Sequence, residues 1–205
     1  MRLIIVLLLL FFTTTVSAQL TRHAAQISFA ASIGTQDTTT YSCFSIQPEI
    51  FLGKYVGLKW NFDLHKRNDN VRQLHGPMGL IGGPLLMLWG LQRGSDGDST
   101  TKMGAGIIGG LLLLALPDGI SFHAPIGNSW DISPYANVLG IDFIKNLDTD
   151  QSCIRYACSF GTEFTYLLKD RVTLSLFAET RKAGGFPWAF GGGFGLGIAL
   201  GERTE

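Results

Sequence analysis

Ser121 and His123 are the residues of this sequence that come closest to a catalytic pattern. A histidine beside a hydroxyl can activate it for attack on an ester, and Asp63, Asp131 or Glu163 could orient the imidazole. The two residues lie only two positions apart, however, and no Gly-x-Ser-x-Gly motif places the serine on a nucleophile-bearing turn. We therefore expect the protein not to be an enzyme, and acyl transfer on lipid is an alternative.

The other residue types that bind metals or phosphates show no suitable spacing. The four histidines are His23, His65, His75 and His123. They lack the short, regular spacing of zinc ligands. The run Gly191-Gly192-Gly193 lacks the strand–turn–helix context of a phosphate loop. We expect neither a metal nor a cofactor. The odd number of cysteines (Cys43, Cys153 and Cys158) leaves at least one thiol unpaired within the chain.

Alternation of apolar and polar residues is the strongest signal along the chain. In 56–64 every second residue is large and apolar, from Val56 to Leu64, and Lys59, Asn61 and Asp63 lie between them. The same alternation occurs in 44–52, 154–168, 171–182 and 187–201, in shorter form in 24–34 and 119–126, and in 130–144 with a change of parity near Val138. Neighbouring side chains of a strand point to opposite faces. The pattern predicts about eight strands, each with one apolar and one polar face, and a bulge near Val138.

The connections between these segments alternate in length. Tight turns are expected at 53–54, 127–129 and 169–170, and longer connections at 35–41, 67–118, 145–152 and 183–186. This asymmetry is typical of transmembrane β-barrels, whose outer surface is apolar. The polar faces then point inward, where charges must pair because an isolated buried charge is costly. The predicted interior network comprises Glu49, Lys59, Asp63, Asp131, Arg155, Glu163, Glu179 and Arg181.

The connection 67–118 breaks the pattern. Residues 76–91 and 103–116 are apolar without alternation, and the polar stretch 92–102 separates them. They predict a helical hairpin inserted between the third and fourth strands. Gly79 and Gly83, like Gly106 and Gly110, are four residues apart, which permits close helix contact. A packing role, a position along the membrane and docking of a protein partner through 67–118 remain open.

The first 18 residues resemble a secretory signal peptide. Arg2 precedes an unbroken apolar run from Leu3 to Phe12, and Val16-Ser17-Ala18 supplies the small residues of a cleavage site. A run of ten residues is short for a membrane span, which needs about 20. We expect a signal peptide at 1–18 and a single barrel domain at 19–205.

Charge gives no indication of a nucleic-acid partner. The chain has 16 basic and 16 acidic residues, and neither end forms a charged tail. No net electrostatic field therefore favours an anionic polymer. The expected partner of the barrel is outer-membrane lipid.

The sequence resembles the small eight-stranded outer-membrane barrels of the OmpA/OmpX-like type over most of residues 23–201. It is most similar to barrels of the Bacteroidetes kind, through Asp131-Ile132-Ser133-Pro134-Tyr135 and Phe164-Thr165-Tyr166. The last strand departs from the type, because it runs through Leu200 to Glu205 without a terminal aromatic residue.

The resemblance implies an all-β, antiparallel up-and-down transmembrane barrel in the bacterial outer membrane. It also implies a non-enzymatic structural or surface-interaction role. Two alternatives remain: a lipid-modifying barrel enzyme, and a soluble periplasmic barrel that binds an apolar ligand with Val56, Leu58 and Trp60 inside.

Overall fold

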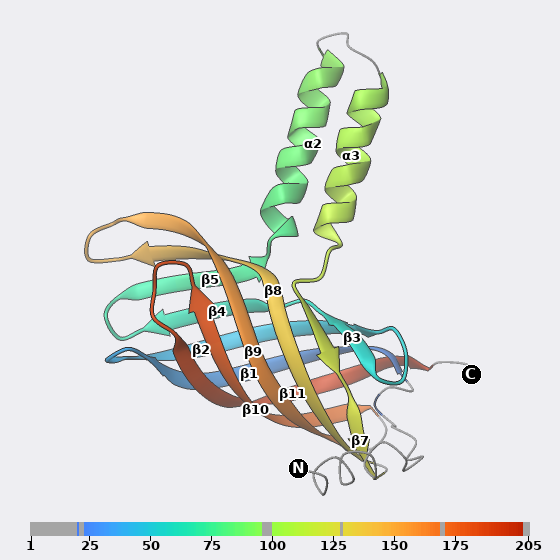
Figure 1. The fold of residues 1–205 in the computed structure, drawn as a ribbon, viewed down its shortest axis with the longest axis vertical. Helices are drawn as coiled ribbons and strands as arrows, with labels where there is room; N and C mark the ends of the chain where they lie inside the picture. Colours follow the sequence, from blue (N-terminus) through green and yellow to red (C-terminus); the bar gives the residue numbers. More distant parts are fainter. Residues whose placement is uncertain (1–19, 21–22, 96–99, 128, 169–170, 203–205) are drawn as a thin grey trace, which may run out of the picture.

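The computed structural model describes residues 20, 23–95, 100–127, 129–168 and 171–202. The predicted signal peptide at 1–18 lies outside these residues. Within the described residues, eleven strands form one antiparallel sheet that closes on itself (Figure 1). They are β1 (His23–Gln36), β2 (Thr39–Phe51), β3 (Val56–Lys59), β4 (Phe62–Arg67), β5 (Val71–Pro77), β6 (Gly119–Phe122), β7 (Ala124–Ile126), β8 (Trp130–Asn146), β9 (Ser152–Leu168), β10 (Val172–Ala183) and β11 (Ala189–Glu202).

The closed wall of the barrel has eight strand positions, which we call wall positions. In order around the ring they are occupied by β1, β2, β4, β5, β8, β9, β10 and β11, and β11 pairs with β1 to close the ring. Two wall positions are each shared by more than one strand. The third is shared by β4 and β3, which pair with successive parts of β2. The fourth is shared by β5, β6 and β7, which pair with successive parts of β8. The predicted antiparallel barrel of about eight strands is confirmed.

The predicted place of the helical insertion is wrong. Helices α2 (Gly79–Ser95) and α3 (Thr100–Leu114) follow β5, so they interrupt the fourth wall position instead of joining the third strand to the fourth. The sequence hid β5 because this strand has only seven residues and runs directly into the apolar segment 76–91. The range 67–118 was therefore too wide. The predicted bulge is confirmed by a register shift between Asn137 and Gly140.

The barrel is apolar outside and polar inside. Large apolar side chains are exposed on all eight ring strands, and Leu176 and Phe194 reach 64% and 65% exposure. The alternating residues, such as Lys59 and Asp63, are buried. The alternative orientation, with Val56, Leu58 and Trp60 inside, is therefore wrong.

Apolar clusters close both ends of the interior. Leu20, Phe51, Leu167 and Ala199 pack together where β2 and β9 end. At the opposite end, Val71, Ile144 and Ala183 pack with Cys153 and Phe186. The polar interior is thus enclosed between two apolar layers. All three cysteines are free.

Helices α2 and α3 form a hairpin that stands away from the barrel wall, across the direction of the strands (Figure 1). Their close contact depends on glycine, as predicted. A Cβ at Gly106 would lie 2.4 Å from the Gly90 Cα, and one at Gly83 would lie 2.7 Å from the Gly110 carbonyl oxygen. Among the described residues, no helix has both the length and the apolarity needed to cross a bilayer.

Candidate functional site: the charged interior of the barrel

The structure gathers most of the predicted interior residues in one column along the barrel. Those buried there are Glu49, Lys59, Asp63, Asp131, Glu163 and Arg181. Glu179 is half-buried and lies in the same column. Arg155 is exposed instead, because it lies near the start of β9, beside a polar turn. There it lines a surface cavity of about 420 Å³ together with Val71 and Phe186.

His123 lies between two carboxylates at the end of the column nearest Phe51. Its Nδ1 is 2.7 Å from Asp131 Oδ2, and its Nε2 is 2.9 Å from Glu49 Oε1. The Phe51 ring packs edge-on against the imidazole at a centroid distance of 5.0 Å. Both ring nitrogens can donate to carboxylates only when the imidazole is protonated. The arrangement therefore suits a cation held between two anions.

Ser121 brings this group close to the geometry of a hydrolase triad. Its Oγ is 3.1 Å from His123 Nε2, and Asp131 faces the other ring nitrogen. The Ser121 hydroxyl, however, donates to Glu49 Oε1, the same oxygen that faces His123 Nε2. That nitrogen is therefore not a free acceptor for the serine proton. Ser121 is also 0% exposed, so a substrate could reach it only if the strands moved.

A lysine ion pair occupies the next layer. Lys59 Nζ lies 3.0 Å from Glu163 Oε2, and both side chains are buried. The same ammonium lies 4.4 Å from the centre of the Tyr135 ring, within cation–π range. The Tyr135 hydroxyl donates to Glu179 Oε2 at 3.0 Å. These contacts link β3, β8, β9 and β10 across the interior.

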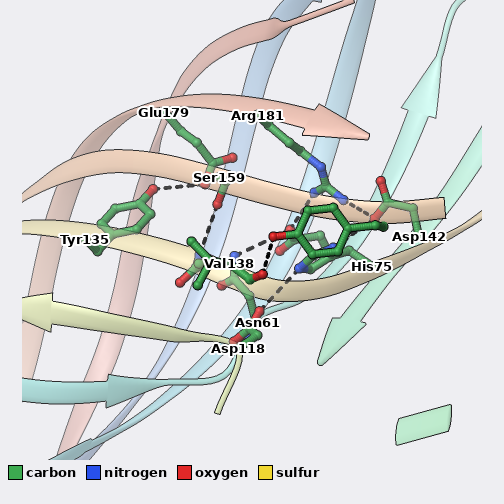
Figure 2. A network of polar contacts seen from close by, with 12 residues as sticks. Asn61, His75, Asp118, Tyr135, Val138, Asp142, Ser159, Glu179 and Arg181 are labelled. Atoms are coloured by element: carbon green, nitrogen blue, oxygen red, sulfur yellow. Dashed lines mark hydrogen bonds and ion pairs between the residues drawn. The ribbon is translucent and has the colours of Figure 1, made fainter. Parts of the chain in front are cut away.

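Arg181 is the centre of the third layer (Figure 2). Its Nη1 donates to Asp63 Oδ2 at 2.8 Å and its Nη2 donates to Asp142 Oδ1. The Nη1 group also contacts His65 Nε2. One guanidinium from β10 therefore neutralises carboxylates on β4 and β8.

His75 repeats the arrangement of His123 (Figure 2). Its Nδ1 is 2.8 Å from Asp142 Oδ1 and its Nε2 is 3.3 Å from Asp118 Oδ2. Gly140 provides the space, because a Cβ there would lie 2.2 Å from His75 Cε1. The other oxygen of Asp118 accepts the backbone N–H of Asn61 at 3.0 Å. The Asp118 side chain thus accepts the hydrogen bond of a backbone N–H in the short gap between β3 and β4.

Cys43, Asp63 and His65 are close enough to be considered as metal ligands. Their ligand atoms all lie within 4.8 Å of one another. Arg181, however, already donates to Asp63 and contacts the His65 Nε2 that a metal would need. A bound cation would have to displace the guanidinium, so these residues do not fit a resident metal.

Sequence reasoning missed His75, Asp118 and Asp142. The first two fell within the range assigned to the insertion. Asp142 could have been found, because the apolar residues Ile141 and Phe143 implied an inward position for it after the bulge.

No family model and no curated protein matches the chain. Among solved structures, it is similar to the N-terminal β-barrel domain of Pseudomonas aeruginosa OprF (10% identity, TM-score 0.46, 84% of this chain and 96% of that one). It is also similar to Neisserial surface protein A (6%, 0.48, 86% and 94%) and to the outer membrane enzyme PagL (8%, 0.44, 84% and 99%). All three identities are at most 10% and all three TM-scores are below 0.5, so function must be argued from this chain's own residues.

Proposed function

We propose that this protein is a non-enzymatic β-barrel of the bacterial outer membrane with a structural or surface-interaction role. One observation carries the proposal: the closed wall is apolar on its outside and charged on its inside. Soluble monomers rarely expose contiguous apolar surface beyond a few hundred Å². A closed sheet also pairs its strands without leaving an edge, which a lipid environment requires.

The filled interior supports a structural role over transport. Eight-stranded barrels are just wide enough for side chains to fill them. Here ion pairs cross the lumen, and the apolar clusters around Phe51 and Val71 close its ends. A solute would have to break several of these contacts to pass.

Ordered polar turns at one end support the surface-interaction role. Arg67 binds both carboxylate oxygens of Asp69, which lowers the pKa of that carboxyl below its usual value. Asn70 Nδ2 donates to Asp148 Oδ1 at 2.9 Å and so joins the β4–β5 turn to the β8–β9 turn. This end of the barrel is opposite the last residues of β11. We propose that this end faces the cell exterior.

Cell fractionation combined with a heat-modifiability gel tests the location. The protein should be recovered with outer membranes, and the unheated sample should migrate differently from the boiled one because the barrel stays closed in mild detergent. Recovery in the soluble periplasmic fraction without detergent would refute the proposal.

Lipid modification is the second candidate, because Ser121, His123 and Asp131 stand at triad distances. We expect that a fluorophosphonate probe will not label the folded protein, because Ser121 is buried and bonded to Glu49. Ser121→Ala should leave any cellular phenotype of the gene unchanged. Labelling that Ser121→Ala abolishes, together with loss of complementation, would make the enzyme the better hypothesis.

A further inference from the structure

The α2–α3 hairpin has no role in the proposed function so far. Large apolar side chains are exposed on both helices, and Leu112 reaches 68% exposure. The further ones include Leu85, Leu88, Ile108 and Leu111. A helix with a solvent-facing side carries a polar stripe there, whereas a helix that is apolar on all sides is buried in protein or lipid. The hairpin therefore needs an apolar environment.

The root of the hairpin lies near the middle of the barrel wall. The Met78 N–H donates to the Leu139 carbonyl at 2.7 Å, and the Val138 N–H donates to the Asp118 carbonyl at 2.7 Å. Val138 and Leu139 form the bulge at the centre of β8, which runs from Trp130 to Asn146. The chain therefore leaves the wall in the middle of the apolar belt and not at either rim (Figure 1).

The belt continues onto the hairpin. Next to the root, Leu74 on β5, Phe122 on β6, and Val138 and Leu139 on β8 are exposed on the outer face. The exposed leucines of α2 and α3 extend this surface outward without a polar interruption at the root. The layer that covers the belt therefore covers the base of the hairpin too.

The outward faces of the helices suit fluid acyl chains better than a second copy of the chain. Helices that associate within a bilayer use small residues, which let the backbones approach. Here the glycines are used inside the hairpin, where Gly83 faces Gly110 and Gly90 faces Gly106. The outward positions carry bulky leucine, isoleucine and tryptophan side chains instead.

We infer that α2 and α3 form a lateral arm embedded in the acyl-chain layer beside the barrel, with lipid chains as its partner. This inference rests on the proposed membrane location. Helix α2 has 17 residues and is therefore about 25 Å long. Half of the apolar band of such a barrel is only about 12 Å. The arm is longer than this distance, so a tilt out of the membrane plane brings its far end, where the polar sequence 92–102 begins, to the headgroups.

Trp89 provides a native probe, because it lies on α2 and is 45% exposed. The test protein keeps Trp89 and carries Trp60→Phe, Trp130→Phe and Trp188→Phe. It is reconstituted into phosphatidylcholine vesicles with or without bromine at mid-chain, and its emission is also titrated with aqueous iodide. A matched control has phenylalanine at all four tryptophan positions and Leu176→Trp on the outer belt. Each variant must first show heat modifiability.

The inference predicts that bromolipid quenches Trp89 about as strongly as the tryptophan of the control, and that iodide quenches neither. Quenching of Trp89 by iodide but not by bromolipid would place the arm in water. Protection from both quenchers would place it against protein, such as a second copy. If bromolipid quenches the Leu176→Trp control, either result would overturn the inference about the arm and leave the proposed membrane location standing. A heat-modifiable control that bromolipid does not quench would refute the membrane location itself.

Discussion

At the scale of single residues, the interior is notable for its excess of acid. Among the described residues, the column contains the carboxyl groups of Glu49, Asp63, Asp118, Asp131, Asp142, Glu163 and Glu179. Its permanent cations are Lys59 and Arg181. His75 and His123 each lie between two of the carboxylates. A protonated imidazole at such a place adds positive charge to that of Lys59 and Arg181. We propose that the two histidines balance the charge of these carboxylates.

Replacement of Lys59 by methionine should leave the buried carboxylate of Glu163 without its positively charged partner. Removing one member of a buried pair costs about 3–5 kcal/mol, so the free energy of unfolding in detergent should fall by about that amount in urea titrations. Arg155→Met is the matched control, because Arg155 is exposed and has no ion pair among the described residues. Its unfolding midpoint should stay near that of the parent. Equal losses for the two variants would contradict the assigned layout.

At the scale of elements, the hairpin depends on glycine at defined positions. Gly106→Ala would place a methyl group 2.4 Å from the Gly90 Cα, and such overpacking typically costs about 1–3 kcal/mol. A methyl group at Gly104 would meet no other atom within 4 Å, so Gly104→Ala should gain up to about 1 kcal/mol of helix propensity. Hydrogen exchange of the hairpin amides should become faster in the first variant and slower in the second. The same change in both would show that the helices do not touch through Gly106.

The elements also show which parts of the fold the sequence could predict. Strands β2, β9, β10 and β11 have 12 to 17 residues each, long enough for alternation to identify them and the direction of their side chains. Strand β5 escaped notice because its seven residues adjoin an apolar helix, whose hydrophobicity hides their alternation. A wall strand interrupted by a hairpin has no local signature in the sequence.

The candidate site was predictable in composition but not in pairing. Parity put Lys59 and Glu163 on the inward side, because each lies opposite to apolar neighbours in its own strand. The pairing depends on the closure of the ring, which brings together residues more than 100 positions apart. Closure places Lys59 against Glu163 and Arg181 against Asp63. Arg155 has the same parity as the buried residues, but parity does not tell where along the strand the closed interior ends.

At the scale of the whole molecule, the outer surface decides whether lipid or water surrounds the barrel. Leu176→Arg should reduce folding into vesicles by about 2–4 kcal/mol if the residue lies near the bilayer midplane. Leu176→Phe, which keeps the site apolar, should fold like the parent. Folding yields in vesicles, read from heat modifiability, compare the two variants. In a soluble barrel an arginine at a position that is 64% exposed would be harmless, so equal yields would argue against the membrane.

The whole molecule also consists of a wall and an appendage, and the two should be separable. The main packing partner of α2 is α3, and neither helix packs extensively on a strand. Met78 and Asp118 both hydrogen-bond to Leu139, so a linker of about three glycines, about 10 Å long, can join Met78 to Pro117. A variant with residues 79–116 replaced by this linker should still close and show heat modifiability with a nearly unchanged unfolding midpoint.

A single substitution at the root should do more damage than this deletion. Asp118→Leu removes the acceptor of the Asn61 N–H and one of the two carboxylates on His75. Each buried polar group left unsatisfied costs about 1–3 kcal/mol, so the full-length variant should unfold at clearly lower urea than the hairpin deletion. The reverse order would mean that the helices hold the fourth wall position in place and that the charged column does not. The hairpin would then be part of the barrel's stability rather than an arm attached to a finished wall.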